Sequence, residues 1–158
     1  MVKCFIILIL VSLCFGSTAF AQDSGLGLGV IIGEPTGLSF KSWTGRSTAV
    51  AGGIAWSFGN RDSLHLHIDY LLHNFSLFRV ETGKFPLYYG IGGRVKFVSN
   101  QGKSNDDNQI GVRVPVGLNY IFTSPSIDIF FEVVPVLDLA PSTDFGITGG
   151  FGIRYFFQ

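Results

Sequence analysis

One segment of the sequence carries the residue types of a hydrolytic site. It contains Ser63, His65, His67 and Asp69, and His73 follows shortly after them. A serine activated by a histidine, which an aspartate orients in turn, performs acyl transfer or ester hydrolysis. In a β-strand, however, alternate residues lie about 7 Å apart along one face, so these side chains form a row rather than a triad. The G-x-S-x-G motif around many nucleophilic serines is absent from the sequence.

A metal site at His65 and His67 is the second alternative that this row raises. Calcium binding in the polar segment Ser99–Asn108 is a third, since that segment contains Asp106 and Asp107. It lacks the regular ligand spacing of calcium loops. We therefore predict no catalytic residues, no metal site and no cofactor, and we interpret the two histidines as side chains that fill the interior of the fold.

The sequence around this row alternates with the period of β-strands. Alternation is clearest in Ser63–Leu72 and in the two halves of Gln109–Leu139, which the turn residues Thr123–Ser126 separate. No helical pattern occurs after the amino-terminal leader. The remaining alternating segments bring the number of predicted strands to eight: Gly25–Gly33, Gly37–Trp43, Ser47–Phe58, Leu87–Val98 and Asp144–Phe157.

The amino terminus has the features of an export signal. Lys3 precedes the apolar segment Phe5–Phe15, and Ala19-Phe20-Ala21 has the small-x-small pattern of a cleavage site. We predict a signal peptide over residues 1–21 and a single domain over residues 22–158. Both cysteines of the chain lie in the leader, so the mature chain has no disulfide.

The composition restricts the class of protein further. Of the 158 residues, 47% are apolar and only 14% are charged, which excludes a disordered chain. No basic patch indicates nucleic-acid binding.

The two faces of the predicted strands differ in a way that fixes which one faces lipid. One face carries most of the aromatic residues, and an eight-stranded interior has too little volume for them. The other face carries glycine, alanine and charge, which fit a narrow lumen. We therefore predict an all-β fold, an eight-stranded antiparallel up-and-down transmembrane β-barrel. Its lumen is predicted to contain a salt-bridge network, because isolated buried charges are costly: Lys41, Asp69, Arg94, Lys96, Arg113, Asp128, Glu132, Asp138 and Arg154.

Turn positions predict partners within this network. A hairpin centred between Ser142 and Thr143 places Arg154 near Phe130, with Asp128 and Glu132 on its two diagonals. On neighbouring strands Arg94 and Arg113 are expected nearly opposite each other. Two adjacent cations require anions between them, and the candidates are Glu132, Asp69 and Asp138.

Two prolines interrupt strands that should be continuous. Pro115 and Pro135 each remove a ladder donor, and a register centred on Ser124–Pro125 brings Pro115 opposite Val134. Both interruptions then lie at the same height on the boundary between these two neighbouring strands, which we call the proline seam. They indicate either a bulge whose carbonyls are satisfied from the lumen or a lateral opening that admits an acyl chain.

The sequence also resembles a known group of proteins. Its export signal, eight strands and charged lumen are similar to those of the small OmpA/OmpX-type barrels of bacterial outer membranes. The segments D-Y-L-L-H-N-F (69–75), P-L-Y-Y-G-I-G-G-R (86–94), G-V-R-V-P-V-G-L (111–118), F-E-V-V-P-V-L-D-L-A-P (131–141) and G-I-R-Y-F-F (152–157) resemble a family of uncharacterised outer-membrane β-barrel proteins. This resemblance implies a fold and an outer-membrane location, and it supplies no activity.

We therefore predict a non-enzymatic integral outer-membrane barrel with a role in envelope structure or surface binding. The alternative is a lipid-A-modifying acyltransferase or deacylase with lateral access near Pro115 and Pro135. Expected partners are outer-membrane lipid and lipopolysaccharide, and Ser99–Asn108 is the candidate site for an extracellular ligand. The barrel-insertion machinery is expected to read the last strand, in which Phe157 supplies the usual terminal aromatic residue, although Gln158 follows it.

Overall fold

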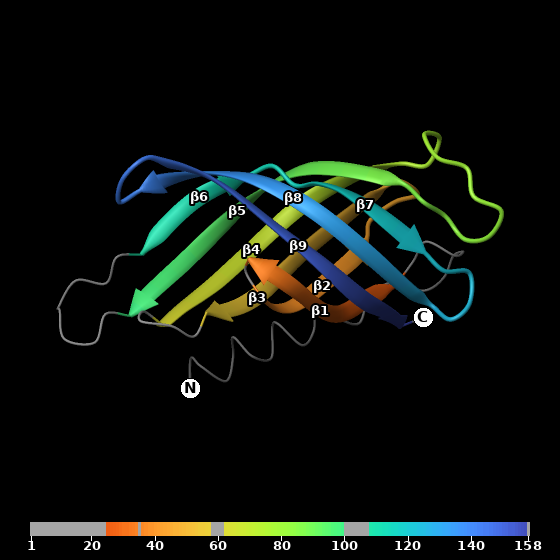
Figure 1. The fold of residues 1–158 in the computed structure, drawn as a ribbon, viewed down its shortest axis with the longest axis horizontal. Helices are drawn as coiled ribbons and strands as arrows, with labels where there is room; N and C mark the ends of the chain where they lie inside the picture. The colour runs from red at the N-terminus through yellow and green to blue at the C-terminus, as the bar shows by residue number, and fades with distance from the viewer. Residues whose placement is uncertain (1–24, 35, 58–61, 100–107, 158) are drawn as a thin grey trace, which may run out of the picture.

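A computed structural model of the chain describes residues 25–34, 36–57, 62–99 and 108–157, and the predicted signal peptide lies outside this part. All regular elements in it are β-strands (Figure 1). None of the described residues forms a helix that could cross a membrane. The strands in chain order are β1 (Leu26–Glu34), β2 (Gly37–Trp43), β3 (Thr48–Ser57), β4 (Asp62–Asn74), β5 (Leu87–Ser99), β6 (Gln109–Arg113), β7 (Val116–Ile121), β8 (Ile127–Ala140) and β9 (Asp144–Phe157).

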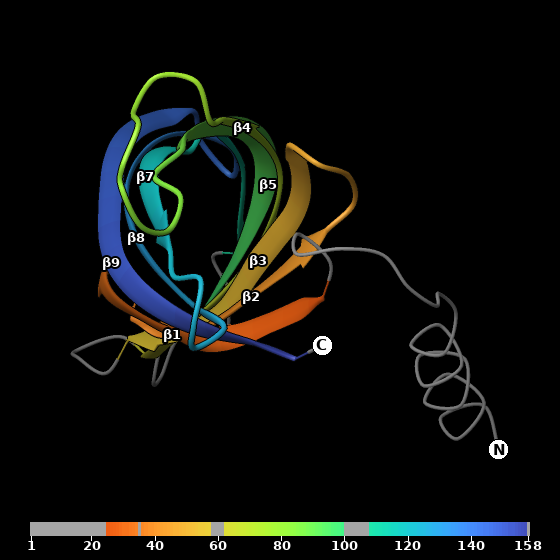
Figure 2. The same ribbon diagram turned by 90° about the vertical axis from the view of Figure 1, so that its right-hand side faces the viewer.

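The strands close into one antiparallel ring of eight positions. Apart from β6 and β7, each strand pairs with its neighbour in the chain, and β1 pairs with β9 from Leu26↔Phe157 to Glu34↔Gly149. β6 and β7 occupy a single position, because both pair with β5 on one side and β8 on the other. Figure 2 looks into this ring along the strands. The predicted eight-stranded antiparallel barrel is confirmed.

Side chains alternate between an apolar exterior and a polar interior. On the outside, Ile68, Ile91 and Ile147 are 58%, 61% and 64% exposed. On the inside, Lys41 and Asp128 are 0% exposed. A soluble barrel buries its apolar face instead, so this inversion is typical of a barrel that lipid surrounds.

Glycines on the inner face make room for the large side chains of the lumen. A Cβ atom added at Gly27 would lie 2.6 Å from the ring of Phe156, and one at Gly117 would lie 2.5 Å from the ring of Tyr88. Both distances are shorter than any carbon–carbon contact in a packed interior. The glycine-rich strands are therefore part of the packing of the lumen.

In the sequence, the apolar alternation slips after Leu72, since Phe75 and Leu77 fall on the other parity, and this slip predicts a β-bulge near His73 and Asn74. The prediction is wrong. β4 keeps one register with β5 through His73↔Tyr88 and Asn74↔Leu87. Phe75 falls out of phase because the strand has ended, and residues 75–86 connect β4 to β5.

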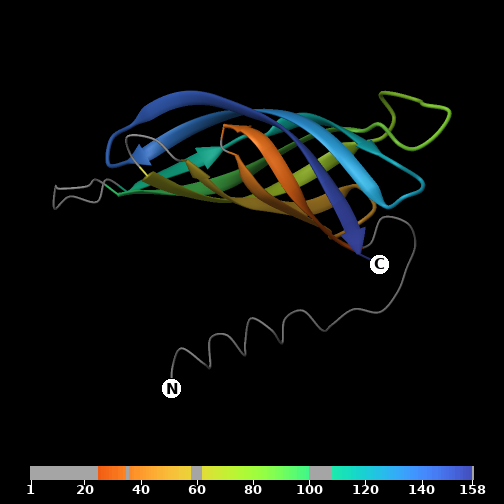
Figure 3. The same cartoon turned by 60° about the horizontal axis from the view of Figure 1, so that its bottom comes forward.

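The strands differ in length around the ring. β2 has 7 residues and β1 has 9, whereas β8 and β9 have 14 each. Figure 3 shows the short orange pair beside the long blue strand β9. The chain enters β1 and leaves β9 at the same end of the barrel, where the 75–86 connection also lies (Figures 1 and 3).

A charged lumen as the candidate functional site

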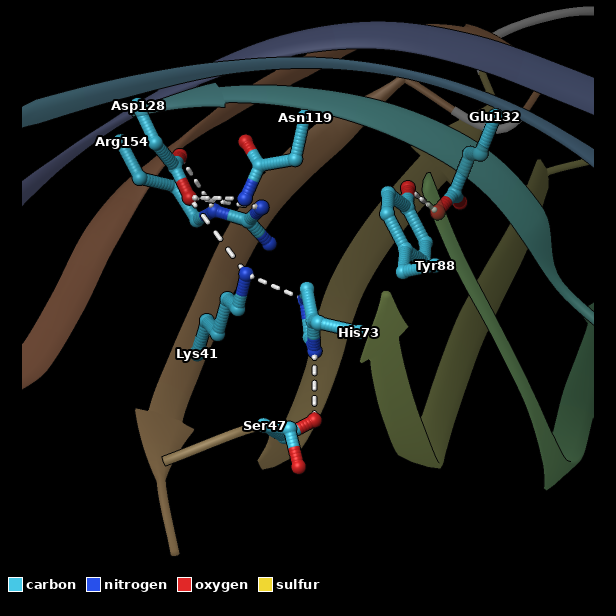
Figure 4. A network of polar contacts seen from close by, with 8 residues as sticks. All are labelled: Lys41, Ser47, His73, Tyr88, Asn119, Asp128, Glu132 and Arg154. Atoms are coloured by element: carbon cyan, nitrogen blue, oxygen red, sulfur yellow. Dashed lines mark hydrogen bonds and ion pairs between the residues drawn. The ribbon is translucent and has the colours of Figure 1, made fainter. Parts of the chain in front are cut away.

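The first cluster of lumenal side chains surrounds Asp128 of β8. Its carboxylate accepts hydrogen bonds from Arg154 at 2.9 Å and 3.2 Å and from the Asn119 amide at 3.1 Å. The ammonium group of Lys41 lies 3.7 Å from the same carboxylate. Figure 4 shows these three groups converging on Asp128 from β9, β7 and β2. One anion therefore serves two cations, and all of these side chains are buried.

Aromatic rings and a histidine complete the environment of the two cations. Lys41 Nζ lies 4.1 Å from the ring centroid of Trp43, and the Arg154 guanidinium lies 3.9 Å from that of Phe130. Such contacts stabilise cations in partly desolvated sites. Lys41 Nζ also lies 2.9 Å from Nε2 of His73, whose Nδ1 is 3.3 Å from the Ser47 carbonyl. Because an ammonium group only donates, Nε2 accepts and the ring proton belongs on Nδ1.

A second cluster surrounds Arg113 of β6. Its Nη2 donates to Glu132 at 3.3 Å, and the Tyr88 hydroxyl donates to the other oxygen of Glu132 at 2.8 Å. Arg113 Nε lies 3.0 Å from Asp69 Oδ1, and this ion pair lacks hydrogen-bond alignment. The arginine thus joins carboxylates from β4 and β8 across the lumen.

A third cluster lies toward the opposite end of the barrel. Arg94 of β5 donates from Nε to Asp138 of β8 at 3.0 Å, and Nη2 contacts the second carboxylate oxygen, so the pair is bidentate. Lys96 is half-buried directly across from His65 on β4, and no ion pair joins it to another residue of the described part. Lys96 is therefore the predicted lumenal charge that stays outside the three clusters.

The partners of Arg154 differ from those expected from the turn position. Asp128 lies directly opposite Arg154, because the β8–β9 register is centred on Pro141, as the pair Asp138↔Asp144 shows, and not between Ser142 and Thr143. Glu132 pairs instead with Arg113. Arg94 and Arg113 are offset by two positions, as Arg94↔Gly111 and Gly92↔Arg113 show, so each takes its own anions.

Several lumenal residues were not among the predicted charges. Tyr88 and Asn119 were visible in the sequence only as inner-face positions of alternating strands. His73 shares the parity of Asp69, but the assumed bulge concealed this. No charge or motif identifies Trp43 or Phe130 as a partner of a cation, because that role depends on packing across the barrel.

The structure does not assemble the hydrolytic residues. Ser63 Oγ lies 3.4 Å from His65 Nε2, but Asp69 is engaged by Arg113 and not by a histidine. The Nδ1 atom of His67 is buried without a hydrogen-bond partner. Among the residues that the structure describes, no three histidine, cysteine or carboxylate side chains gather as metal ligands would.

Hydrogen bonds continue across the proline seam. Val114 N donates to the Pro135 carbonyl at 3.0 Å, and Gly90 N donates to the Pro115 carbonyl at 2.9 Å. The register on both sides of Pro115 matches that of a turn centred on Ser124–Pro125. Each proline lacks one donor, yet each contributes its carbonyl to the ladder.

This closed ring with an apolar outer face and a charged lumen defines a small barrel of the outer-membrane type. Among solved structures, the fold matches the crystal structure of the N-terminal β-barrel domain of Pseudomonas aeruginosa OprF, with a TM-score of 0.64. The match covers 86% of this chain and 98% of that domain at 15% sequence identity, so it shows the shared fold. The predicted resemblance to OmpA-type barrels is confirmed.

The chain belongs to the family described as "Protein of unknown function (DUF3996)", whose model matches residues 19–156. A comparison with curated proteins gives no match.

Proposed function

We propose that this protein is a non-enzymatic integral barrel of the bacterial outer membrane whose lumen is closed by side chains. Its role in this proposal is to support the envelope or to present a binding surface. The outward apolar wall would contact outer-membrane lipid, including lipopolysaccharide, and the strand that ends at Phe157 would engage the insertion machinery.

The observation that carries the proposal is the set of contacts between strands that are not neighbours. Lys41 of β2 reaches Asp128 of β8, past β1 and β9. Asp69 of β4 reaches Arg113 of β6, past β5. Such contacts span the lumen at more than one height. They are expected in an eight-stranded barrel, whose interior is just wide enough for side chains, and they oppose a water-filled pore.

Two experiments test the proposal. After expression of the full chain, the mature protein should fractionate with the outer membrane and resist extraction at alkaline pH, and recovery in the soluble periplasmic fraction would contradict it. The purified protein, reconstituted into planar bilayers, should give conductance at background level. Discrete conductance steps would mean that the clusters do not close the lumen.

The acyl-modifying alternative has no observation in its favour. Ser63 lies beside His65, but Asp69 is engaged by Arg113 and orients no histidine, and hydrogen bonds cross the seam at both prolines. A deletion strain should therefore have an unchanged lipid A mass spectrum. The other proposed contact, an extracellular ligand at Ser99–Asn108, falls mainly on residues 100–107, outside the described residues.

A further inference from the structure

The connection between β4 and β5 folds back onto the barrel wall. Lys84 and Ile121 exchange backbone hydrogen bonds of 2.8 Å and 2.9 Å, which extends the β5–β7 pairing to the rim. The Tyr120 hydroxyl donates to the Thr82 carbonyl at 2.8 Å. Gly83, which lies between Thr82 and Lys84, has a φ of 76°, a conformation that favours glycine. The loop therefore has a defined position at the end of the barrel where β1 begins and β9 ends (Figure 1).

Aromatic side chains connect this loop to the lipid-facing wall. Phe78 packs on Phe85 at 5.5 Å between ring centroids, Phe85 on Tyr120 at 6.1 Å, and Tyr120 on Phe122 at 4.7 Å. Phe78 is 43% exposed and Phe122 is 37% exposed. Aromatic girdles of this kind mark the membrane–water interface of outer-membrane barrels, which places the loop at the depth of lipid headgroups.

The loop and the β2–β3 turn together line an open pocket of about 430 Å³. Its charged lining consists of Arg46, Arg79 and Lys84 and includes no carboxylate; Glu81, the acidic residue of the loop, is not part of it. Lys84 Nζ also lies 5.6 Å from the ring centroid of Phe75. The rest of the lining is apolar or small: Phe75, Phe78, Val80, Gly83 and Phe85.

We propose that this rim pocket binds the headgroup phosphate of an anionic phospholipid. Arginine forks match phosphate oxygens, and the neighbouring aromatic side chains offer an apolar surface for the glycerol and upper acyl segments. The pocket volume falls in the range of small-ligand sites and exceeds what a phosphate ion fills. The inference rests on the proposed membrane function, since the pocket meets lipid only when the barrel is inserted.

The test uses the mature protein inserted into vesicles of equal parts phosphatidylcholine and phosphatidylglycerol, followed by detergent release and native mass spectrometry. We expect phosphatidylglycerol to be retained over phosphatidylcholine. Arg46→Gln and Arg79→Gln should each weaken retention about five-fold, because one basic residue near an anionic lipid surface contributes ~1 kcal/mol. The double variant should weaken it about thirty-fold by the same reasoning.

Lys103→Gln is the matched control, because it removes the same charge from the β5–β6 connection. It should leave retention unchanged. Equal retention of both lipids by the wild type, or an equal loss in Lys103→Gln, would overturn the proposal. Displacement of phosphatidylglycerol by inorganic phosphate alone would also overturn it, since the site would then bind the free ion. Heat-dependent gel mobility reports insertion separately, so failure of the barrel to insert is distinguished from failure of the pocket to bind.

Discussion

The Asp128–Arg154 pair gives the sharpest test of the lumenal network. Replacing Asp128 with Asn removes the carboxylate on which Lys41 and Arg154 converge and leaves these two buried cations beside each other. Removing one partner of a buried ion pair costs about 3–5 kcal/mol, and we expect Asp128→Asn to lower the free energy of unfolding by that amount. Arg154→Gln should cost about 1–3 kcal/mol, because Asp128 keeps its contacts with Lys41 and Asn119.

The double variant measures the coupling. Because the pair is bidentate and both side chains are buried, the interaction energy should reach about 1.5–3 kcal/mol, toward the upper end of measured cycles. Glu132→Gln combined with Arg154→Gln is the control cycle. Asp128 and Glu132 are four residues apart on β8, about 13 Å along the strand, so Glu132 should be additive with Arg154 within about 0.5 kcal/mol.

The assay is urea unfolding of the barrel in detergent micelles. Tryptophan fluorescence and gel mobility monitor the unfolding. Trp43 lies against Lys41 and reports the cluster directly. An additive Asp128–Arg154 cycle would refute the reasoning, and so would coupling of Arg154 to Glu132 of equal size.

Three further predictions concern the packing of the lumen and its closure. Tyr88→Phe removes the 2.8 Å hydrogen bond to buried Glu132 and should lower the free energy of unfolding by about 1–3 kcal/mol; an unchanged urea midpoint would contradict this role. Gly27→Ala should cost about 1–3 kcal/mol through overpacking against Phe156. Its control is Gly146→Ala, whose added Cβ meets nothing within 4 Å and should leave stability unchanged or slightly higher; equal losses would show that glycine spacing is unimportant. Pro115→Ala restores an N–H opposite Gly90, and the variant should remain at background conductance in planar bilayers, whereas a lateral or axial leak would assign the proline a role in closure.

The division into wall and lumen could be predicted from the sequence because it depends only on a period of two. The alternation from Ile110 to Phe122 continues across the break at Pro115, so the inner and outer faces stay correct even where the ladder is interrupted. The β7–β8 register was also accessible, since the turn residues Ser124 and Pro125 centre it.

The expected anions for Arg94 and Arg113 included Glu132, Asp69 and Asp138, and these are the carboxylates that the two arginines contact. The sequence could not assign each carboxylate to its partner across the barrel. Tyr88 meets Glu132, and Arg94 meets Asp138, over distances that depend on barrel width, strand stagger and rotamers, none of which a local pattern contains. The β8–β9 register failed for a simpler reason. Its centre was expected between the polar residues Ser142 and Thr143, but the pair Asp138↔Asp144 centres it on Pro141.

The unequal strands mean that the wall does not have one height. At a rise of about 3.3 Å per residue and a tilt of about 45°, β2 spans roughly 16 Å along the membrane normal and β8 roughly 33 Å. The apolar band of outer-membrane barrels is about 25 Å tall, so β2 falls short of it while β8 exceeds it. In the proposed membrane location, hydrophobic mismatch is then expected on one flank, and the bilayer should thin beside β1 and β2 to meet the shorter wall. The barrel thereby imposes a sideways gradient of bilayer thickness, and lipids with short or disordered acyl chains should gather on that flank.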